Sequence, residues 1–166
     1  MATQFRDMDK EGLLTRKVCD EVWTKESAGC YAESAGGNHM EVSERYESDV
    51  LFFFEGRPGE LTVYQELFRC LEAEFSDTSV KVQKSQISFY NRHLYAMVSL
   101  PRRKKDSGLL VTFGLARRLA SPRVVMAVEP YPGRWTHHVL VSGEEQIDRE
   151  LLEWIREAYE FAAGKR

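Results

Sequence analysis

Apolar and polar residues alternate with a period of two through the middle of this 166-residue chain. Val80 and Val82, for example, alternate with Lys81 and Gln83. Successive side chains of a β-strand point to opposite faces, so this period is typical of strands with one buried face and one open face. The same period recurs in residues 87–90, 94–100 and 109–113, and residues 124–128 and 136–141 are two further predicted strands. We therefore expect an antiparallel meander sheet of about five or six strands.

Apolar residues with helical spacing flank this region on both sides. Before it, Tyr46, Val50 and Phe53 form a stripe that ends near Gly56, a residue suited to the end of a helix. A second stripe contains Leu61, Tyr64, Leu67, Phe68, Leu71 and Phe75. After the strands, Asp148 is a favourable N-cap for a third helix. The order predicts an α+β fold, with N-terminal helices and one C-terminal helix packed on one face of the sheet.

The length favours a single α+β domain over residues 41–166, preceded by an acidic N-terminal arm over residues 1–40. In that arm Leu14, Val18 and Val22 predict a helix, and a Gly/Ser-rich linker follows it. No apolar run approaches the roughly 18 residues that a membrane helix needs. The first residues also lack the apolar core of a signal peptide. We expect a cytoplasmic chain without a membrane partner.

The cysteines and histidines do not form a recognisable metal-binding pattern. There are three cysteines, Cys19, Cys30 and Cys70, and none is in a CxxC pair. An odd number with this spacing argues against a disulfide framework. Cys19, Cys30 and His39 lack the paired short spacing of a zinc site. We expect no metal and no cofactor, and Cys70 is interpreted as a small buried residue.

The chain has no phosphate-binding loop, no dinucleotide glycine fingerprint and no hydrolase or metalloprotease signature. His137 and His138 are adjacent on a predicted strand, so their side chains point to opposite faces and cannot share one metal. We expect His137 to face the core as a hydrogen-bonded histidine and His138 to face outward. No catalytic residue is predicted. Whether the chain is an enzyme is left open, and the absence of motifs favours a non-enzyme.

Charge is divided unevenly along the chain. Residues 81–134 contain eleven basic residues and only two acidic ones, Asp106 and Glu129, for a net charge of +9. The whole chain has a net charge of −3, so the remainder carries −12. The predicted strands and their loops are therefore basic, whereas the predicted helices and the arm are acidic.

If the apolar members of each strand face the helices, the opposite face is defined by the alternation. It would present Lys81, Gln83, Ser88, Tyr90, Tyr95, Met97, Ser99, Thr112 and His138. With the loop cations, the candidate binding residues are Lys81, Tyr90, Arg92, Tyr95, Arg102, Arg103, Lys104, Lys105 and His138. Such a face is compatible with simple solvation, with a protein partner or self-association, and with an anionic ligand such as nucleic acid. We expect a non-catalytic binding or interaction module that uses this basic, tyrosine-bearing face.

An alternative places function on the other side of the sheet. Trp135, His137 and Tyr159 bring polar and aromatic groups near the loop at residues 130–133. A pocket there, at the margin between sheet and helices, would suit a small enzyme or a receptor for a small ligand.

Three segments resemble a known family. They are Lys-Ser-Gln-Ile-Ser-Phe at residues 84–89, Leu-Tyr-Ala at residues 94–96, and the closing stretch from His137-His138-Val139 through Ile147-Asp148 to Ala158-Tyr159. Over roughly Val50 to Phe161 the chain resembles a small prokaryotic domain-of-unknown-function family, found alone or at the end of chains labelled "predicted transport protein" and similar in pattern to YdhG-like domains. The resemblance implies an α+β fold and no established activity.

Overall fold

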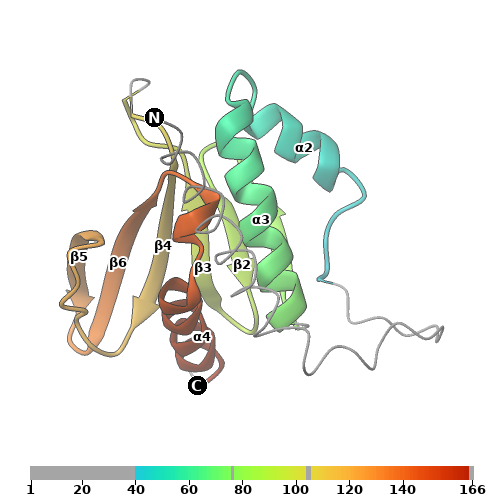
Figure 1. Ribbon diagram of the computed structural model, residues 1–166. Coiled ribbons are helices and arrows are strands. Elements are labelled where there is room, and N and C mark those ends of the chain that lie inside the picture. The colour runs from blue at the N-terminus through green and yellow to red at the C-terminus, as the bar shows by residue number, and fades with distance from the viewer. Residues whose placement is uncertain (1–39, 76, 104–105, 165–166) are drawn as a thin grey trace, which may run out of the picture.

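The computed structural model describes residues 40–75, 77–103 and 106–164. The helices are α2 (Tyr46–Phe53), α3 (Pro58–Glu74) and α4 (Arg149–Ala163), with a short 3-10 helix at Glu144–Gln146. The strands are β1 (Ser79–Val82), β2 (Ile87–Tyr90), β3 (Leu94–Ser99), β4 (Leu109–Leu115), β5 (Val124–Tyr131) and β6 (Arg134–Val141). The predicted α+β fold is confirmed (Figure 1). The helix predicted in the arm lies outside the described residues.

The six strands form one open sheet in the order β1-β2-β3-β4-β6-β5, and every neighbouring pair is antiparallel. The first four strands are a meander, as expected. After β4 the chain crosses to the edge of the sheet, where it forms β5, and β6 then lies between β4 and β5. The turn from β5 into β6 uses Gly133, whose φ of +69° favours glycine. This exchange at one edge leaves β5 with a neighbour on one side only.

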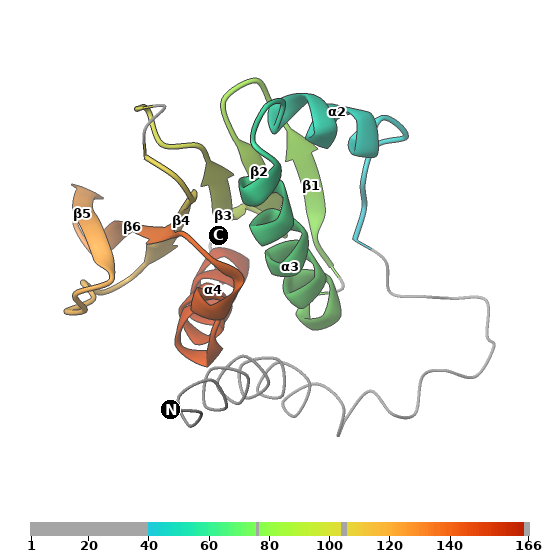
Figure 2. The ribbon, with the colours of Figure 1, turned by 45° about the horizontal axis from the view of Figure 1, so that its top comes forward.

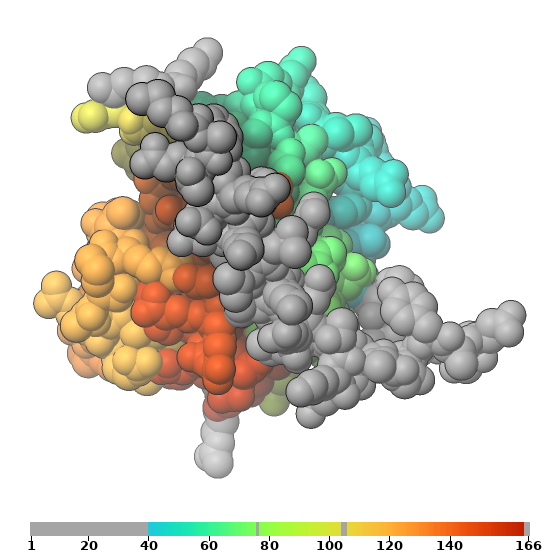
Figure 3. Space-filling view, in the orientation of Figure 1, coloured from blue at the N-terminus to red at the C-terminus, as the bar shows by residue number. Residues whose placement is uncertain are grey.

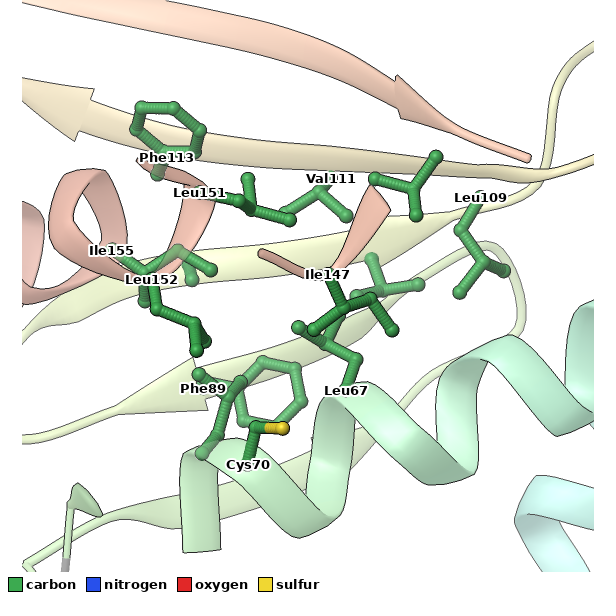
Figure 4. Packing of buried hydrophobic residues seen from close by; sticks show 14 of the residues in the cluster. Leu67, Cys70, Phe89, Leu109, Val111, Phe113, Ile147, Leu151, Leu152 and Ile155 are labelled. Carbon is green, nitrogen blue, oxygen red and sulfur yellow. The ribbon is translucent and has the colours of Figure 1, made fainter. Parts of the chain in front are cut away.

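All three helices lie on the same face of the sheet. Figures 1 and 2 show α3 and α4 side by side across the strands, with α2 near β1. Figure 4 shows α3 and α4 placing Leu67, Cys70 and Ile155 against Phe89 and Phe113 of the sheet. The apolar stripes of both long helices are thus buried on the apolar face of the strands, the arrangement that an α+β fold requires.

Local sequence signals explain where α3 and α4 begin. Pro58 is the first residue of α3, a position at which the missing amide hydrogen costs nothing. Asp148 is the N-cap of α4, as predicted, and its Oδ1 accepts a hydrogen bond from the Leu151 amide at 3.0 Å.

Among the residues that the structure describes, no helix combines the length and apolar character needed to cross a membrane.

The alternation predicts the faces correctly for most of the sheet but not at the start of β3. A β-bulge makes Tyr90 pair with Leu94 while Phe89 pairs with Ala96, so Tyr95 is the extra residue. The alternation predicted that Leu94 faces the helices and that Tyr95 lies on the open face, and both predictions are wrong. Leu94 shares the open face with Tyr90. Tyr95 is only 2% exposed and lies beneath the helices. Its hydroxyl hydrogen-bonds that of Thr78 at 3.0 Å, and burial raises its pKa.

Candidate functional site

A groove of about 380 Å³ lies on the open face of the sheet. One wall is the turn between β2 and β3, and the other is the hairpin between β5 and β6, with β4 between them. Both walls lie at one end of the sheet because β3 and β6 start there and β4 ends there. Its lining includes His93, Leu94, Met97, Thr112, Gly114, Tyr131, Arg134 and Thr136.

Gly114 explains why the face is hollow at this point. Alternation along β4 places Gly114 on the open side, between buried Phe113 and Leu115, and it pairs with Thr136. A Cβ atom at Gly114 would meet only the carbonyl oxygen of Trp135, at 3.9 Å, which is ordinary contact. The hollow therefore exists because a side chain is missing, not because the backbone demands glycine.

Hydrogen bonds hold both walls of the groove in place. In the β2–β3 turn, the Asn91 side-chain amide donates to the Tyr159 carbonyl at 2.8 Å, which ties this turn to α4. The His93 amide donates to Asn91 Oδ1 at 3.1 Å. In the opposite wall, the Gly133 amide donates to Glu129 Oε1 at 2.9 Å. A site with fixed walls loses little conformational entropy when a ligand binds.

Cationic and aromatic side chains collect around this end of the sheet. Tyr131 is 65% exposed and Arg134 is exposed beside it in the hairpin. Across the groove, Arg92 is exposed in the β2–β3 turn. Farther along, the Lys81 Nζ lies 5.1 Å from the centre of the Tyr90 ring, a cation–π contact. This combination suits a ligand that has flat rings and negative charge.

His138 lies on the open face in the middle of the sheet, as predicted. Its Nδ1 is 2.8 Å from the Thr112 hydroxyl on the neighbouring strand. Burial lowers the pKa of His138, because the charged imidazolium is poorly solvated there. The side chain is thus held by a cross-strand partner, and it lies beside the groove without lining it.

The structure separates the other predicted binding residues. Lys81, Tyr90 and Arg92 lie toward the groove end, whereas Arg102 and Arg103 are exposed beyond the opposite end of β3. Lys104 and Lys105 lie outside the described residues. Tyr95 is among the residues that line the groove, but its side chain is buried under the helices.

Some of the predicted basic residues face the helices and are neutralised there. Arg117 makes a two-pronged ion pair with Glu157 of α4, at 2.9 and 2.7 Å. Arg123 pairs with Asp148 at 2.8 Å and with Glu150 at 3.0 Å. The positive surplus of the open face is therefore smaller than the sequence count of eleven basic residues suggests.

The three residues of the alternative pocket have separate contacts on the helix side. Trp135 lies beneath the Arg118 guanidinium, 5.5 Å from the ring centre. Tyr159 stacks on Phe75, with ring centres 4.6 Å apart. His137 is 0% exposed, so a ligand cannot reach its ring in this conformation.

His137 is a hydrogen-bonded core residue, as expected. Its Nε2 accepts a hydrogen bond from the Leu119 amide at 3.0 Å, and its ring stacks on Phe113. Burial, followed by the nearby Arg117 charge, lowers the pKa of His137. The Nδ1 atom is buried without a hydrogen-bond partner among the described residues. The acceptor role of Nε2 requires the neutral ring with its proton on Nδ1.

The groove residues that sequence reasoning missed include His93, Gly114, Tyr131 and Arg134. The first comes from a turn, the second from the open side of β4, and the last two from a hairpin. The Pro-Tyr-Pro-Gly segment at residues 130–133 identified the hairpin loop, but no local signal indicated that it faces the β2–β3 turn.

The fold and the groove define a small α+β domain with an open antiparallel sheet, and the face opposite the described helices carries the candidate site. The chain belongs to the family described as Domain of unknown function (DUF5655), whose model matches residues 53–162. That match begins at the end of α2, ends within α4 and includes the whole groove. The expected relationship to a domain-of-unknown-function family is thus confirmed. No curated protein and no solved structure matches the chain.

Proposed function

We propose that the chain is a non-catalytic binding module whose open sheet face holds single-stranded nucleic acid, with the groove over Gly114 as the main contact. The observation that carries this proposal is the grouping of exposed Tyr131 and Arg134 around a groove with fixed walls. Open sheets that bear aromatic and basic residues are a recurring platform for unpaired bases and their phosphates.

The chemistry of the groove supports a ligand with both rings and phosphates. The Tyr131 ring offers a stacking surface, and stacking does not depend on base identity because every base has a flat face. Arg134 offers a guanidinium, which pairs with phosphate oxygens in a two-pronged geometry. The Thr136 hydroxyl in the lining donates or accepts hydrogen bonds.

The rest of the open face supports continued contact with an extended strand. From β1 to β5 there are five strand spacings, about 24 Å in all, which is enough for several nucleotides. Lys81 and Tyr90 lie near the far side of this path. Glu150 and Glu157 of α4 lie on the helix side of the sheet and pair with Arg123 and Arg117, so they do not oppose an anion on the open face.

Fluorescence anisotropy with labelled single-stranded DNA and RNA 12-mers, at salt concentrations from 50 to 200 mM, tests the proposal. We expect binding that weakens with salt, because each phosphate contact adds about 0.7 to the slope of log affinity against log salt. Tyr131→Ala removes a stacking platform worth about 1–3 kcal/mol, which corresponds to a loss of roughly 5- to 150-fold. Arg134→Ala is expected to reduce the salt slope by about 0.7.

Two further variants make this test specific. Arg149→Ala removes the same charge from the exposed surface of α4, on the helix side, and is the matched control for Arg134→Ala. Gly114→Val fills the groove without a change in charge, and its Cβ atom would make only an ordinary contact with the Trp135 carbonyl oxygen, at 3.9 Å. Absent binding, or equal losses for Arg134→Ala and Arg149→Ala with no loss for Gly114→Val, would contradict the proposed function.

A further inference from the structure

The two edges of the sheet differ in how they are covered. At the β1 edge, Glu41 forms a parallel bridge with Ser79. The Glu41 amide donates to the Thr78 carbonyl at 2.8 Å, and the Val80 amide donates to the Glu41 carbonyl at 2.9 Å. At the β5 edge, no backbone segment among the described residues pairs with the outer side of the strand. Figure 3 shows the β5–β6 hairpin (orange) at the margin of the molecule.

The bare β5 edge is also apolar. Met126 is 50% exposed, Val128 is 46% exposed, and Val125 is exposed beside them. Glu129 is the only charged residue between Arg123 and Arg134. An exposed edge strand without a central charge is a template for pairing with another strand, and natural proteins usually protect such an edge. Pro130 and the two bulges protect the ends of β5, so residues 126–128 are the stretch that remains able to pair with another strand.

We propose that β5 pairs antiparallel with β5 of a second copy, so that two sheets join into one. The pairing of Met126, Ala127 and Val128 with β6 is regular, and bulges interrupt it on either side. We therefore place the two-fold axis at Ala127, the centre of the regular stretch. Met126 of each copy then faces Val128 of the other, and the small Ala127 lies opposite itself.

This register avoids charge repulsion. Within the regular stretch, residues 126–128, neither copy carries a charge, so no like charges lie opposite one another. On the open face, two Met126–Val128 pairs would form a continuous apolar strip across the axis. The flanking bulges restrict the ladder to a short stretch, so we expect a reversible dimer whose population depends on concentration.

The proposed dimer goes beyond the proposed function and does not depend on it. A two-fold axis perpendicular to the sheet keeps both open faces on the same side. The two grooves would then lie on one extended surface. Nucleic-acid binding can fail while the dimer persists, and the dimer can be absent while binding persists, so the two experiments are distinguishable.

Sedimentation velocity and light scattering of the full chain from 1 to 200 µM test the dimer. We expect a shift from monomer to dimer over this range in the wild type. Met126→Lys and Val128→Glu should each raise the dissociation constant roughly 2- to 30-fold, because each variant disrupts both Met126–Val128 cross-strand pairs, worth about 0.2–1 kcal/mol each. Phe52→Lys is the matched control, since Phe52 is 76% exposed on α2, far from β5, and it should leave the dissociation constant unchanged.

The double variant Met126→Lys/Val128→Glu tests the register itself. If Met126 faces Val128 of the second copy, the double variant creates two oppositely charged cross-strand pairs and should recover dimerisation relative to either single variant. A wild type that stays monomeric at 200 µM would overturn the proposal. So would a dimer that both single variants leave intact, or one that Phe52→Lys disrupts. Circular dichroism of each variant verifies that the exposed substitutions leave the fold unchanged.

Discussion

At the junction between the start of β5 and the start of α4, the contribution of a helix cap to stability can be measured separately from the contribution of an ion pair. Asp148 Oδ1 accepts the Leu151 amide at 3.0 Å, and both carboxylate oxygens lie 2.8 Å from Arg123 Nη1. One carboxylate thus has two roles. Asp148→Asn keeps a good N-cap and removes the charge, whereas Asp148→Ala removes both.

The structure sets the expected magnitudes. The cap contributes about 1 kcal/mol in typical helices. The Arg123–Asp148 pair is partly exposed, so after allowance for solvent screening it contributes about 0.2–1 kcal/mol. Asp148→Asn should therefore lower the free energy of unfolding by at most about 1 kcal/mol, and Asp148→Ala by about 1.2–2 kcal/mol. The larger change corresponds to a decrease in Tm of roughly 3–8 °C.

Urea denaturation followed by circular dichroism measures these differences, with Arg123→Ala and the Arg123→Ala/Asp148→Asn double variant completing a double-mutant cycle. Arg123 also lies over the Trp154 ring, but that contact is lost in both arms of the cycle and cancels. Equal destabilisation by Asp148→Asn and Asp148→Ala would refute the cap argument. A coupling energy of zero between Arg123 and Asp148 would refute the ion-pair argument.

Two further predictions concern stability. Because the pKa of His137 is lowered in the folded state, the unfolded chain takes up a proton at a higher pH than the folded chain does. The free energy of unfolding should therefore fall as pH decreases below about 6.5, by up to about 1.4 kcal/mol per pH unit. Urea denaturation at several pH values should show a smaller change of this free energy with pH in His137→Phe. Gly108→Ala should lower the free energy of unfolding by about 1–3 kcal/mol, because φ is +107° and the added Cβ would lie 2.7 Å from the Val141 carbonyl oxygen. Gly59→Ala, with open space around it, is the control and should cause no loss; equal effects at both glycines would contradict the argument.

Local sequence patterns predicted most elements correctly because the residues that form one face of a helix or strand lie close together in the sequence. The stripe at Leu67 and Leu71 identified α3, and Asp148 identified the start of α4. His137 and His138 were assigned to opposite faces by alternation alone, and the structure places them there. Each of these inferences required only a few consecutive residues.

Features that depend on pairing between distant segments were not predictable in this way. Tyr95 was misplaced because its bulge exists only in the register between β2 and β3. Similarly, β6 lies between β4 and β5 because of the strands with which it pairs, and the sequence of β6 alone does not determine this position. The groove residues come from separate turns and strands, so only their assembly reveals them.

The sequence by itself determined which segments are helices and strands and which side of most strands is apolar, since burying that side stabilises any arrangement that covers it. The tertiary structure decided the strand order, the position of the groove and which cations remain on the open face. The physical reason is that these properties arise from contacts between residues such as Arg123 and Asp148, or Gly114 and Thr136, which are more than twenty positions apart in the chain.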